Sequence, residues 1–275
     1  HLGFHPDLPG HALARGADAL VTSAHKALPA ISQGALLLAR TDRLDADRLE
    51  AGFEATATTS PAGSILASID ASRALLARDG LALLGPVLTA VADARARLAE
   101  VPGLVVPDGA AYDPLKLLVV LAGTGADGVA VEADLLAARM PVELADRDTV
   151  VAMVTMADTP DGIAAFVEAL VVAVERHRGT PRPVAPGAAW TVVPEQVMSP
   201  RAAFFARHTV VVAAEAVGQV SAELVAPYPP GVPVLAPGER VTAQALAVLR
   251  AARAHGTRVP YAADPSLETL RVVTG

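Results

Sequence analysis

Residues 22–38 read "TSAHKALPAISQGALLL" and contain one of the two lysines in a chain of 275 residues that has 20 arginines. Because this sequence usually places arginine where a cation is needed, a lysine at position 26 indicates a need for a primary amine. Only the lysine amine condenses with an aldehyde, since guanidinium stays protonated and is a poor nucleophile. The alternative is a structural or surface lysine, and the second lysine, Lys116, is interpreted as an ordinary residue at a strand edge.

The neighbours of Lys26 favour a chemical role. Ser23 and His25 place a hydroxyl and an imidazole next to the amine. Residues 17–23 and 34–40 are predicted to be short buried strands, covered on both faces as in α/β sheets. An amine with polar neighbours at the end of a strand is what a pyridoxal phosphate (PLP) site needs. The alternative is that Ser23 forms a turn and that His25 is satisfied locally.

Composition excludes several classes of function. A net charge of −7 without any Lys/Arg block argues against nucleic-acid binding, and the absence of cysteine excludes disulfides and thiolate sites. No uncharged apolar run reaches the roughly 18 residues of a membrane helix, and no secretion signal is recognisable. We therefore expect a cytoplasmic protein with at least two domains, whose partner is a small molecule or another copy of itself.

The part of the chain after the two strands is predicted to be helical. Ser60 and Pro61 are typical helix-entry residues, and apolar residues recur at helical spacing over residues 64–80. Gly80 is interpreted as the end of this helix, because glycine is favoured just past the last turn. A second helix is predicted over residues 87–101. The polar residues that precede Ser60 are assigned to no helix or strand.

Residues 85–180 alternate between strand and helix patterns, which is typical of a small α/β domain. The predicted strands are 103–107, 116–123 and 148–158, and the predicted helices are 128–139 and 159–177. The proline-rich segment 178–190 is interpreted as a linker. Beyond it, helices are predicted over residues 213–225 and 242–256, the second with Thr242 as its cap.

These motifs resemble one known family. "SAHKALPAISQGALLL" is similar to the Ser-x-His-Lys lysine motif of the Orn/Lys/Arg decarboxylases, which are fold type I PLP enzymes. The resemblance covers nearly the whole chain, and its most specific parts are the lysine motif and a Pro-Tyr-Pro-Pro-Gly stretch. Further similar stretches are "HLGFHPDLP" (1–9), "TTSPAGSILASIDASR" (58–73), "DPLKL" (113–117), "VELADRDTVVAMVTMADT" (142–159) and "EAVGQVSAELVAPYPPGVPVLAPGE" (215–239).

The resemblance implies a site for PLP. Lys26 matches the lysine that binds the cofactor as a Schiff base, and Ser23 and His25 match positions that line the cofactor and its phosphate. Thr58 and Thr59 match a hydroxyl-rich turn that reaches the phosphate of the neighbouring subunit. A homodimer with active sites at its interface is thereby implied.

The resemblance also implies a fold and a division into domains. Residues 1–84 correspond to the carboxyl-terminal part of a fold type I, PLP-dependent transferase-like large domain with an interface helix. Residues 85–180 form a small α/β domain, residues 181–190 a linker, and residues 191–275 a C-terminal α+β decarboxylase domain. The expected fold class is therefore α/β.

The implied reaction is decarboxylation of arginine, lysine or ornithine to the corresponding amine, as in polyamine metabolism. PLP accepts the electron pair that is left when CO₂ departs, and Lys26 or His25 returns a proton to the α-carbon. Two alternatives stay open. One is another fold type I PLP enzyme, such as an aminotransferase or a lyase, and the other is a truncated, non-catalytic member of the family.

The sequence departs from the family pattern at two places. The family's Asp-Glu-Ala-His-Gly stretch, whose aspartate pairs with the pyridine nitrogen, is absent from these 275 residues. The chain therefore resembles an amino-terminally truncated member, and we expect this piece by itself to bind PLP weakly. After Pro61, Ala62 and Gly63 replace a Tyr or His that commonly borders the substrate entrance, so the identity of the basic amino acid stays open.

A metal site is not expected. His1, His5 and His11 are close in sequence, but Asp7 is the one carboxylate at ligand spacing near them. The family resemblance accounts for this segment without a metal. The implied cofactor is PLP alone.

Overall fold

The computed structural model describes residues 3–184, 191–228 and 231–274. The described chain mixes helices and strands, in agreement with the coarse α/β prediction. It divides into two compact units: His1–Arg97 with Pro107–Leu117 and Met153–Val167, and Leu98–Val106 with Leu118–Ala152 and Glu168–Gly275. The four domain ranges expected from the sequence remain predictions.

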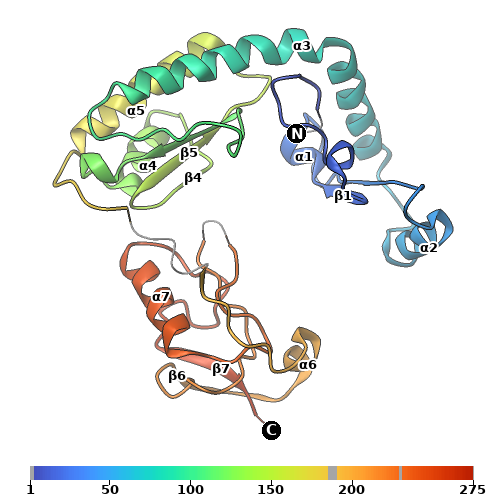
Figure 1. The fold of residues 1–275 in the computed structure, drawn as a ribbon, viewed down its shortest axis with the longest axis vertical. Helices are drawn as coiled ribbons and strands as arrows, with labels where there is room; N and C mark the ends of the chain where they lie inside the picture. The colour runs from blue at the N-terminus through green and yellow to red at the C-terminus, as the bar shows by residue number, and fades with distance from the viewer. Residues whose placement is uncertain (1–2, 185–190, 229–230, 275) are drawn as a thin grey trace. The chain divides into compact units, whose positions relative to one another are not determined.

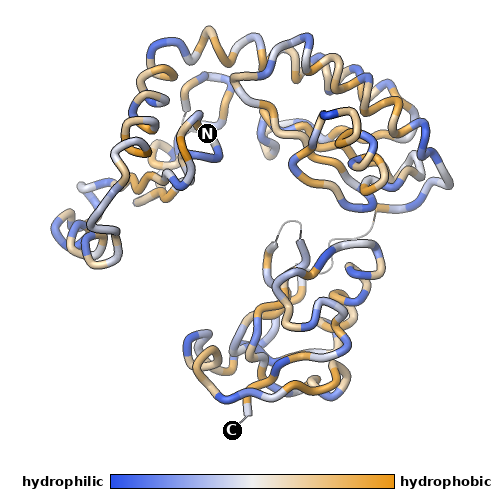
Figure 2. Tube along the Cα trace, turned by 180° about the vertical axis from the view of Figure 1, so that it is seen from behind, coloured by the Kyte–Doolittle hydropathy of each residue, from blue (hydrophilic) through white to orange (hydrophobic). Residues whose placement is uncertain are grey.

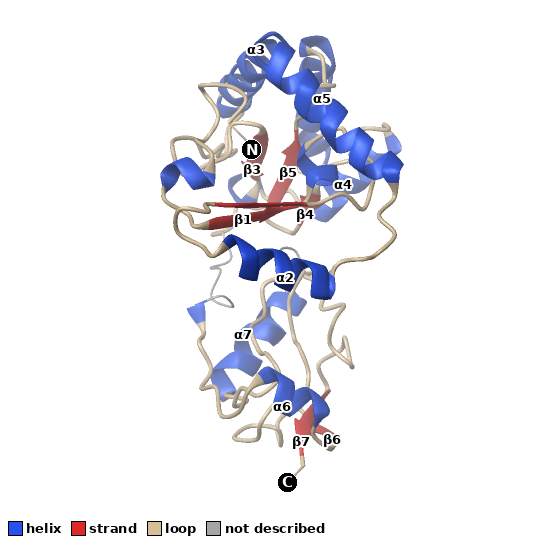
Figure 3. Ribbon diagram, turned by 90° about the vertical axis from the view of Figure 1, so that its right-hand side faces the viewer, coloured by secondary structure: helices blue, strands red, loops and turns tan. Residues whose placement is uncertain are grey.

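Helices and small sheets alternate along the chain (Figures 1 and 3). The described helices are α1 (Ala24–Ala27), α2 (Ala46–Thr56), α3 (Gly63–Ala99), α4 (Gly128–Ala137), α5 (Pro160–Arg176), α6 (Pro200–Phe205) and α7 (Ala243–Ala254). The described strands form three sheets: β1 (Ala19–Thr22) with β2 (Leu36–Ala39); β3 (Lys116–Val120), β5 (Thr149–Met153) and β4 (Leu144–Ala145) in this order; and β6 (His208–Val212) with β7 (Thr269–Val273).

The two strands beside Lys26 form an antiparallel pair, in which Ala19 lies opposite Ala39 and Thr22 lies opposite Leu36. Both predicted strands are confirmed, but the prediction that they are covered on both faces is wrong for this chain. Val21 is 74% exposed, and β1 alternates between exposed and half-buried residues. Among the described residues, no second layer covers the face of β1 that carries Val21.

Helix α3 runs without interruption from Gly63 to Ala99, so the two predicted helices are one, and the predicted end at Gly80 is wrong. A Cβ atom at Gly80 would lie 3.1 Å from the carbonyl oxygen of Phe4. Close approach of the N-terminal segment therefore explains this glycine. The helix bends part-way along its length (Figure 1), and its middle contains Gly80, Gly85 and Pro86, of which Pro86 has no N–H for a helical hydrogen bond.

Helix α3 is long and contains one markedly apolar stretch. Hydrophobic residues recur along it among hydrophilic ones (Figure 2). By length and composition it is the one described helix that could cross a membrane, and 28% of its most apolar stretch is buried. Long packing helices share these properties, so this single helix is weak support for a membrane span.

Helix α2 was not predicted, and it buries no residue. Its start nevertheless carries a recognisable signal, since the Asp45 side chain accepts a hydrogen bond from the Arg48 N–H at 3.1 Å. In contrast, the predicted helix over residues 213–225 is wrong. That segment consists of turns and isolated bridges, and Gly218 adopts a left-handed φ of 88°, which a continuous helix does not contain.

The three-stranded sheet confirms predicted strands at β3 and β5 and adds the short strand β4. The predicted strand 103–107 is wrong, because it contributes only an isolated bridge between Val105 and Val120. The predicted helices over 128–139 and 159–177 are confirmed as α4 and α5. Gly128 begins α4 at a close approach, since a Cβ atom there would collide with the carbonyl oxygen of Asp146.

The C-terminal part has a hydrophobic core of its own. Thr242 caps α7 as predicted, accepting the Ala245 N–H at 3.0 Å. Helix α7 lies beside β6 and β7 (Figure 1) and buries Leu249 together with Leu270 and Val272 of β7. The buried cluster comprises Ala213, Ala216, Val225, Val234, Leu235, Val241, Ala245, Leu246, Leu249, Val259, Ala262, Leu267, Leu270 and Val272.

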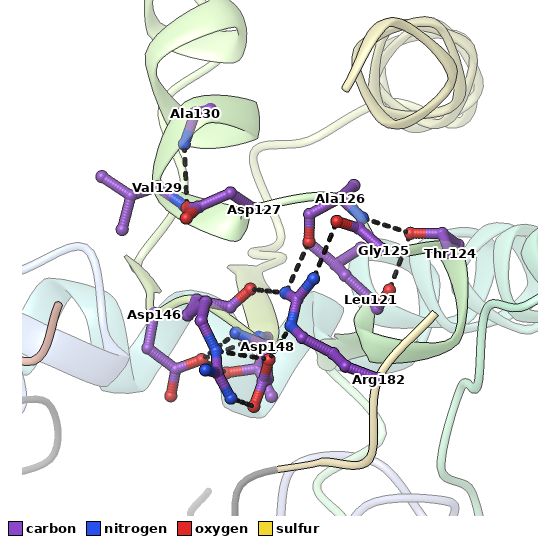
Figure 4. Close-up of polar contacts among 12 residues, drawn as sticks. Leu121, Thr124, Gly125, Ala126, Asp127, Val129, Ala130, Asp146, Asp148 and Arg182 are labelled. Atoms are coloured by element: carbon purple, nitrogen blue, oxygen red, sulfur yellow. Dashed lines mark hydrogen bonds and ion pairs between the residues drawn. The ribbon is translucent and has the colours of Figure 1, made fainter. Parts of the chain in front are cut away.

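A buried polar network holds the segment that follows α5 (Figure 4). The Arg182 guanidinium donates to Asp148 Oδ1 at 2.8 Å and to the carbonyl oxygens of Gly125, Ala126 and Arg147 at 2.7, 2.7 and 2.6 Å. The Asp148 side chain is only 6% exposed. One arginine therefore satisfies carbonyl groups from two separate turns and neutralises a buried carboxylate.

Asp148 also binds a second arginine. Arg147 donates to both carboxylate oxygens of Asp148, each at 3.0 Å, and this hydrogen bonding raises the pKa of Arg147 above its usual range. The second residue of the predicted linker 181–190, Arg182, is thus anchored. Residues 185–190 of that linker lie outside the described residues.

Candidate active site

Ser23, His25 and Lys26 lie together on one short turn between β1 and β2. Strand β1 ends at Thr22, and α1 follows directly, with Ser23 at its N-cap position. The Ser23 hydroxyl makes no capping hydrogen bond, while the Lys26 N–H donates to the Ser23 carbonyl oxygen at 3.1 Å. The hydroxyl therefore remains available to a ligand. We call residues 23–26 the lysine turn.

His25 is held from one side by Gly34. The Gly34 carbonyl oxygen lies 2.7 Å from His25 Nδ1 and accepts the His25 backbone N–H at 3.3 Å. Because a carbonyl oxygen only accepts hydrogen bonds, Nδ1 must carry the hydrogen. In the neutral imidazole, Nε2 is then the nitrogen with a lone pair, and it is the ring atom left to a ligand.

Lys26 is exposed, whereas its neighbours on α1 anchor the turn. Ala24 and Leu28 are buried and lie on the face of the turn opposite to Lys26. Within the described part of the chain, the Lys26 amine takes part in no ion pair with a carboxylate. The turn thus presents an unpaired primary amine, as the rarity of lysine in the sequence suggests.

Two serines of α3 hold the loop that follows the lysine turn, and sequence reasoning missed both. Ser68 Oγ accepts the Ile31 N–H at 2.9 Å, and Ser72 Oγ lies 2.9 Å from the Pro29 carbonyl oxygen, to which it donates. A spacing of four residues on a predicted helix places two side chains on one face, and that was the available signal. The positions of the backbone groups that they bind follow only from the tertiary structure.

Thr58 and Thr59 lie elsewhere in the same unit, in the exposed turn between α2 and α3. Thr58 Oγ1 accepts the Ser60 N–H at 3.2 Å, which stabilises this turn. No described hydrogen bond joins either threonine to Ser23, His25 or Lys26. The structure therefore brings three of the five predicted site residues together and leaves the other two apart.

The histidines near the N-terminus make local contacts. His5 Nδ1 accepts the Asp7 N–H at 3.2 Å, and His11 Nδ1 accepts the Leu13 N–H at 3.3 Å. His1 lies outside the described residues, as do Pro229 and Pro230 of the Pro-Tyr-Pro-Pro-Gly stretch. Within residues 3–184, 191–228 and 231–274, no group of three or more His, Asp or Glu side chains is arranged to hold a metal ion.

Comparison with protein families decides the assignment. The sequence model of the family described as "Orn/Lys/Arg decarboxylase, major domain" matches residues 3–106, which include the lysine turn. A second family model, described as "Orn/Lys/Arg decarboxylase, C-terminal domain", matches residues 186–263. The chain belongs to the Orn/Lys/Arg decarboxylase family. The resemblance seen in the sequence motifs is thereby confirmed.

Curated relatives in the family align over almost the whole chain. An arginine decarboxylase of Halalkalibacterium halodurans is 32% identical, and the alignment covers 99% of this chain and 58% of the relative. An arginine decarboxylase of Bacillus subtilis is 31% identical, with the same two coverages. This chain therefore spans somewhat more than half the length of the curated relatives it matches.

Solved structures in the family share the fold. The constitutive lysine decarboxylase of E. coli superposes with a TM-score of 0.71 at 19% identity, over 93% of this chain and 49% of that chain. Lysine decarboxylase A of Pseudomonas aeruginosa superposes with a TM-score of 0.72, also at 19% identity, over the same shares. At such identities the likeness concerns the fold, and it supports the mixed helix-and-strand architecture described above.

Proposed function

We propose that this chain carries the lysine-bearing part of a PLP-dependent decarboxylase that converts arginine, lysine or ornithine to the corresponding amine. The observation that carries the proposal is the lysine turn, which presents the unpaired amine of Lys26 at the end of a strand. Membership of the Orn/Lys/Arg decarboxylase family and relatives named arginine decarboxylase support the reaction and the substrate class.

The residues of the lysine turn fit one side of a PLP site. Lys26 offers a primary amine to the aldehyde of the cofactor, and the Ser23 hydroxyl, unused as a helix cap, offers a donor to its phosphate. The ring atom of His25 that can contact a ligand is Nε2, because Nδ1 is hydrogen-bonded to the Gly34 carbonyl oxygen. Within these 275 residues we assign no carboxylate to the pyridine nitrogen, so this fit covers the lysine side alone.

The proposed chemistry divides between cofactor and protein. When bound, PLP supplies the electron sink that makes loss of CO₂ from an amino acid feasible. The protein residues position groups and move protons: Lys26 would hold the cofactor, and the protonated Lys26 amine, or His25 after Nε2 has taken up a proton, would return a proton to the substrate carbon. The product is an amine of the polyamine type.

A product assay tests the proposed reaction. With PLP and each of arginine, lysine and ornithine in turn, we expect the complete protein that contains this chain to release CO₂ from one of the three in an amount equal to the amine formed. Manometric or radiochemical measurement of CO₂, together with chromatography of the amine, checks this result. Formation of a keto acid in place of CO₂ would point to an aminotransferase, and no product with any of the three would point to a non-catalytic protein.

We also propose a homodimer with shared active sites, in which Thr58 and Thr59 reach the phosphate in the partner's site. Their exposure, and their lack of hydrogen bonds to their own lysine turn, support this assignment. We expect Lys26→Ala protein and Thr58→Val/Thr59→Val protein to be nearly inactive alone. After subunit exchange between equal amounts of the two variants, half of the dimers contain one subunit of each kind. Each of these mixed dimers has one intact site, made of Lys26 from one subunit and Thr58 and Thr59 from the other.

The mixture should therefore recover about a quarter of the wild-type rate. The decarboxylation rate after denaturation and joint refolding of equal amounts measures this recovery, and light scattering checks that dimers form. Joint refolding that yields only the summed rates of the two variants would contradict shared sites.

A further inference from the structure

The loop that follows the lysine turn is attached to α3 at three neighbouring positions. Ser68 Oγ accepts the Ile31 N–H, and Ser72 Oγ donates to the Pro29 carbonyl oxygen. Between the two serines, Ile69 packs against Gly34, where a Cβ atom would lie 3.0 Å from Ile69 Cδ1. Ser72 lies four residues after Ser68 and three after Ile69, and these spacings place its side chain next to both on one side of α3.

The hydroxyl groups are themselves oriented by α3. Ser68 Oγ donates to the Ile65 carbonyl oxygen at 2.7 Å, which leaves its lone pairs for the Ile31 N–H. Ser72 is only 4% exposed, and its one hydroxyl hydrogen is shared between the Ser68 carbonyl oxygen at 2.7 Å and the Pro29 carbonyl oxygen at 2.9 Å. Loss of the buried Ser72 hydroxyl therefore leaves the Pro29 carbonyl oxygen without this hydrogen-bond donor.

The far end of the loop returns to the lysine turn. Gly34, which Ile69 contacts, accepts both the backbone N–H and the ring Nδ1–H of His25. Hydrogen bonds and packing therefore run without a break from α3, through the loop, to the residue next to Lys26. A shift of this loop on α3 must move His25, and the Lys26 backbone moves with it.

We propose that Ser68 and Ser72 are positioning residues, which set the direction of the Lys26 amine and of His25 Nε2 by fixing the loop to α3. This inference rests on the proposed role of Lys26 as the PLP lysine. The serines themselves contact no reacting group, and their effect is transmitted by Pro29, Ile31 and Gly34.

The test compares Ser72→Ala and Ser68→Ala with Ser64→Ala, a matched control, because Ser64 is an exposed serine on the same helix. Hydrogen exchange of the peptide that covers residues 28–35, followed by mass spectrometry without cofactor, measures the attachment of the loop. We expect roughly fivefold faster exchange in each of the two loop variants, as loss of one ordinary hydrogen bond predicts, and no change in the control.

The second readout is the covalent bond between Lys26 and PLP. Borohydride reduction fixes the cofactor, and peptide mass spectrometry measures the fraction of Lys26 modified at limiting PLP across a range of pH. We expect this fraction to fall roughly fivefold in Ser72→Ala and Ser68→Ala, with a displaced pH profile, and Ser72→Thr to restore both. A serine that served only stability would leave the pH profile of the folded protein unchanged.

The outcomes separate the two proposals. If the complete wild-type protein fixes no PLP on Lys26, the proposed function fails, and the positioning role fails with it. If the wild type fixes PLP but the loop variants match Ser64→Ala in exchange and in pH profile, the positioning role alone is overturned. Faster exchange with an unchanged pH profile also overturns it, because the loop would then be only structural.

Discussion

We expect Lys26→Ala in the complete protein to abolish the borohydride-dependent fixation of PLP and to lower decarboxylation by roughly a thousandfold or more. The size of the effect follows from the loss of the nucleophile that holds the cofactor, which no neighbouring group replaces. Ser23 has no amine, and the His25 imidazole forms no stable bond with an aldehyde. Steady-state CO₂ release and peptide mass spectrometry after reduction measure the two effects.

The chain offers an internal control, because Lys116 is its one other lysine. Lys116 is exposed at the start of β3, and Lys116→Ala should leave both PLP fixation and the decarboxylation rate near wild type. Only the peptide that contains Lys26 should gain the mass of the reduced cofactor. Equal labelling of both lysines, or a reducible complex in Lys26→Ala protein, would contradict the assignment.

We expect Asp148→Ala to lower the free energy of unfolding by about 3–5 kcal/mol, which is typical when one partner of a buried charge pair is removed. The carboxylate lies 2.8 Å from Arg182 Nε and 3.0 Å from Arg147 Nη2, so its loss leaves two guanidinium groups without their counter-charge. Urea denaturation followed by circular dichroism measures the change. Hydrogen exchange of residues 143–150 tests whether the turn between β4 and β5 loosens.

An exposed ion pair provides the comparison. Asp70 lies 2.9 Å from Arg73 on α3, and the two side chains are 73% and 58% exposed. Because water screens such pairs, Asp70→Ala should cost at most about 1 kcal/mol. The interpretation of the Asp148 network is refuted if Asp148→Ala destabilises the protein no more than Asp70→Ala does.

Local patterns predicted much of the secondary structure. The strands β1, β2, β3 and β5 and the helices α4, α5 and α7 lie where apolar periodicity and capping residues such as Thr242 indicate them. The errors have physical causes. Gly80 resembles a helix end, but α3 continues because the glycine accommodates Phe4, a residue far away in the sequence. Helix α2 was missed because it buries no apolar face.

The candidate site divides in the same way. Ser23, His25 and Lys26 could be identified from the sequence because they are neighbours on one turn. The hydrogen bonds between Ser68 and Ile31 and between Ser72 and Pro29 could not be identified from the sequence, since the partners are separated by 37 and 43 positions. Whether a serine on a helix meets water or an unpaired carbonyl depends on the chain segment that packs beside it, which no local pattern specifies.

The sequence by itself determined the chemistry at position 26: a primary amine where nearly every other cation is arginine, in a motif that assigns the chain to the Orn/Lys/Arg decarboxylase family. The tertiary structure decided how that amine is held. Nδ1 of His25 is bonded to Gly34, and the loop between them is fixed to α3. The reason is that functional groups are properties of single residues, whereas hydrogen bonds and burial arise only when distant segments meet.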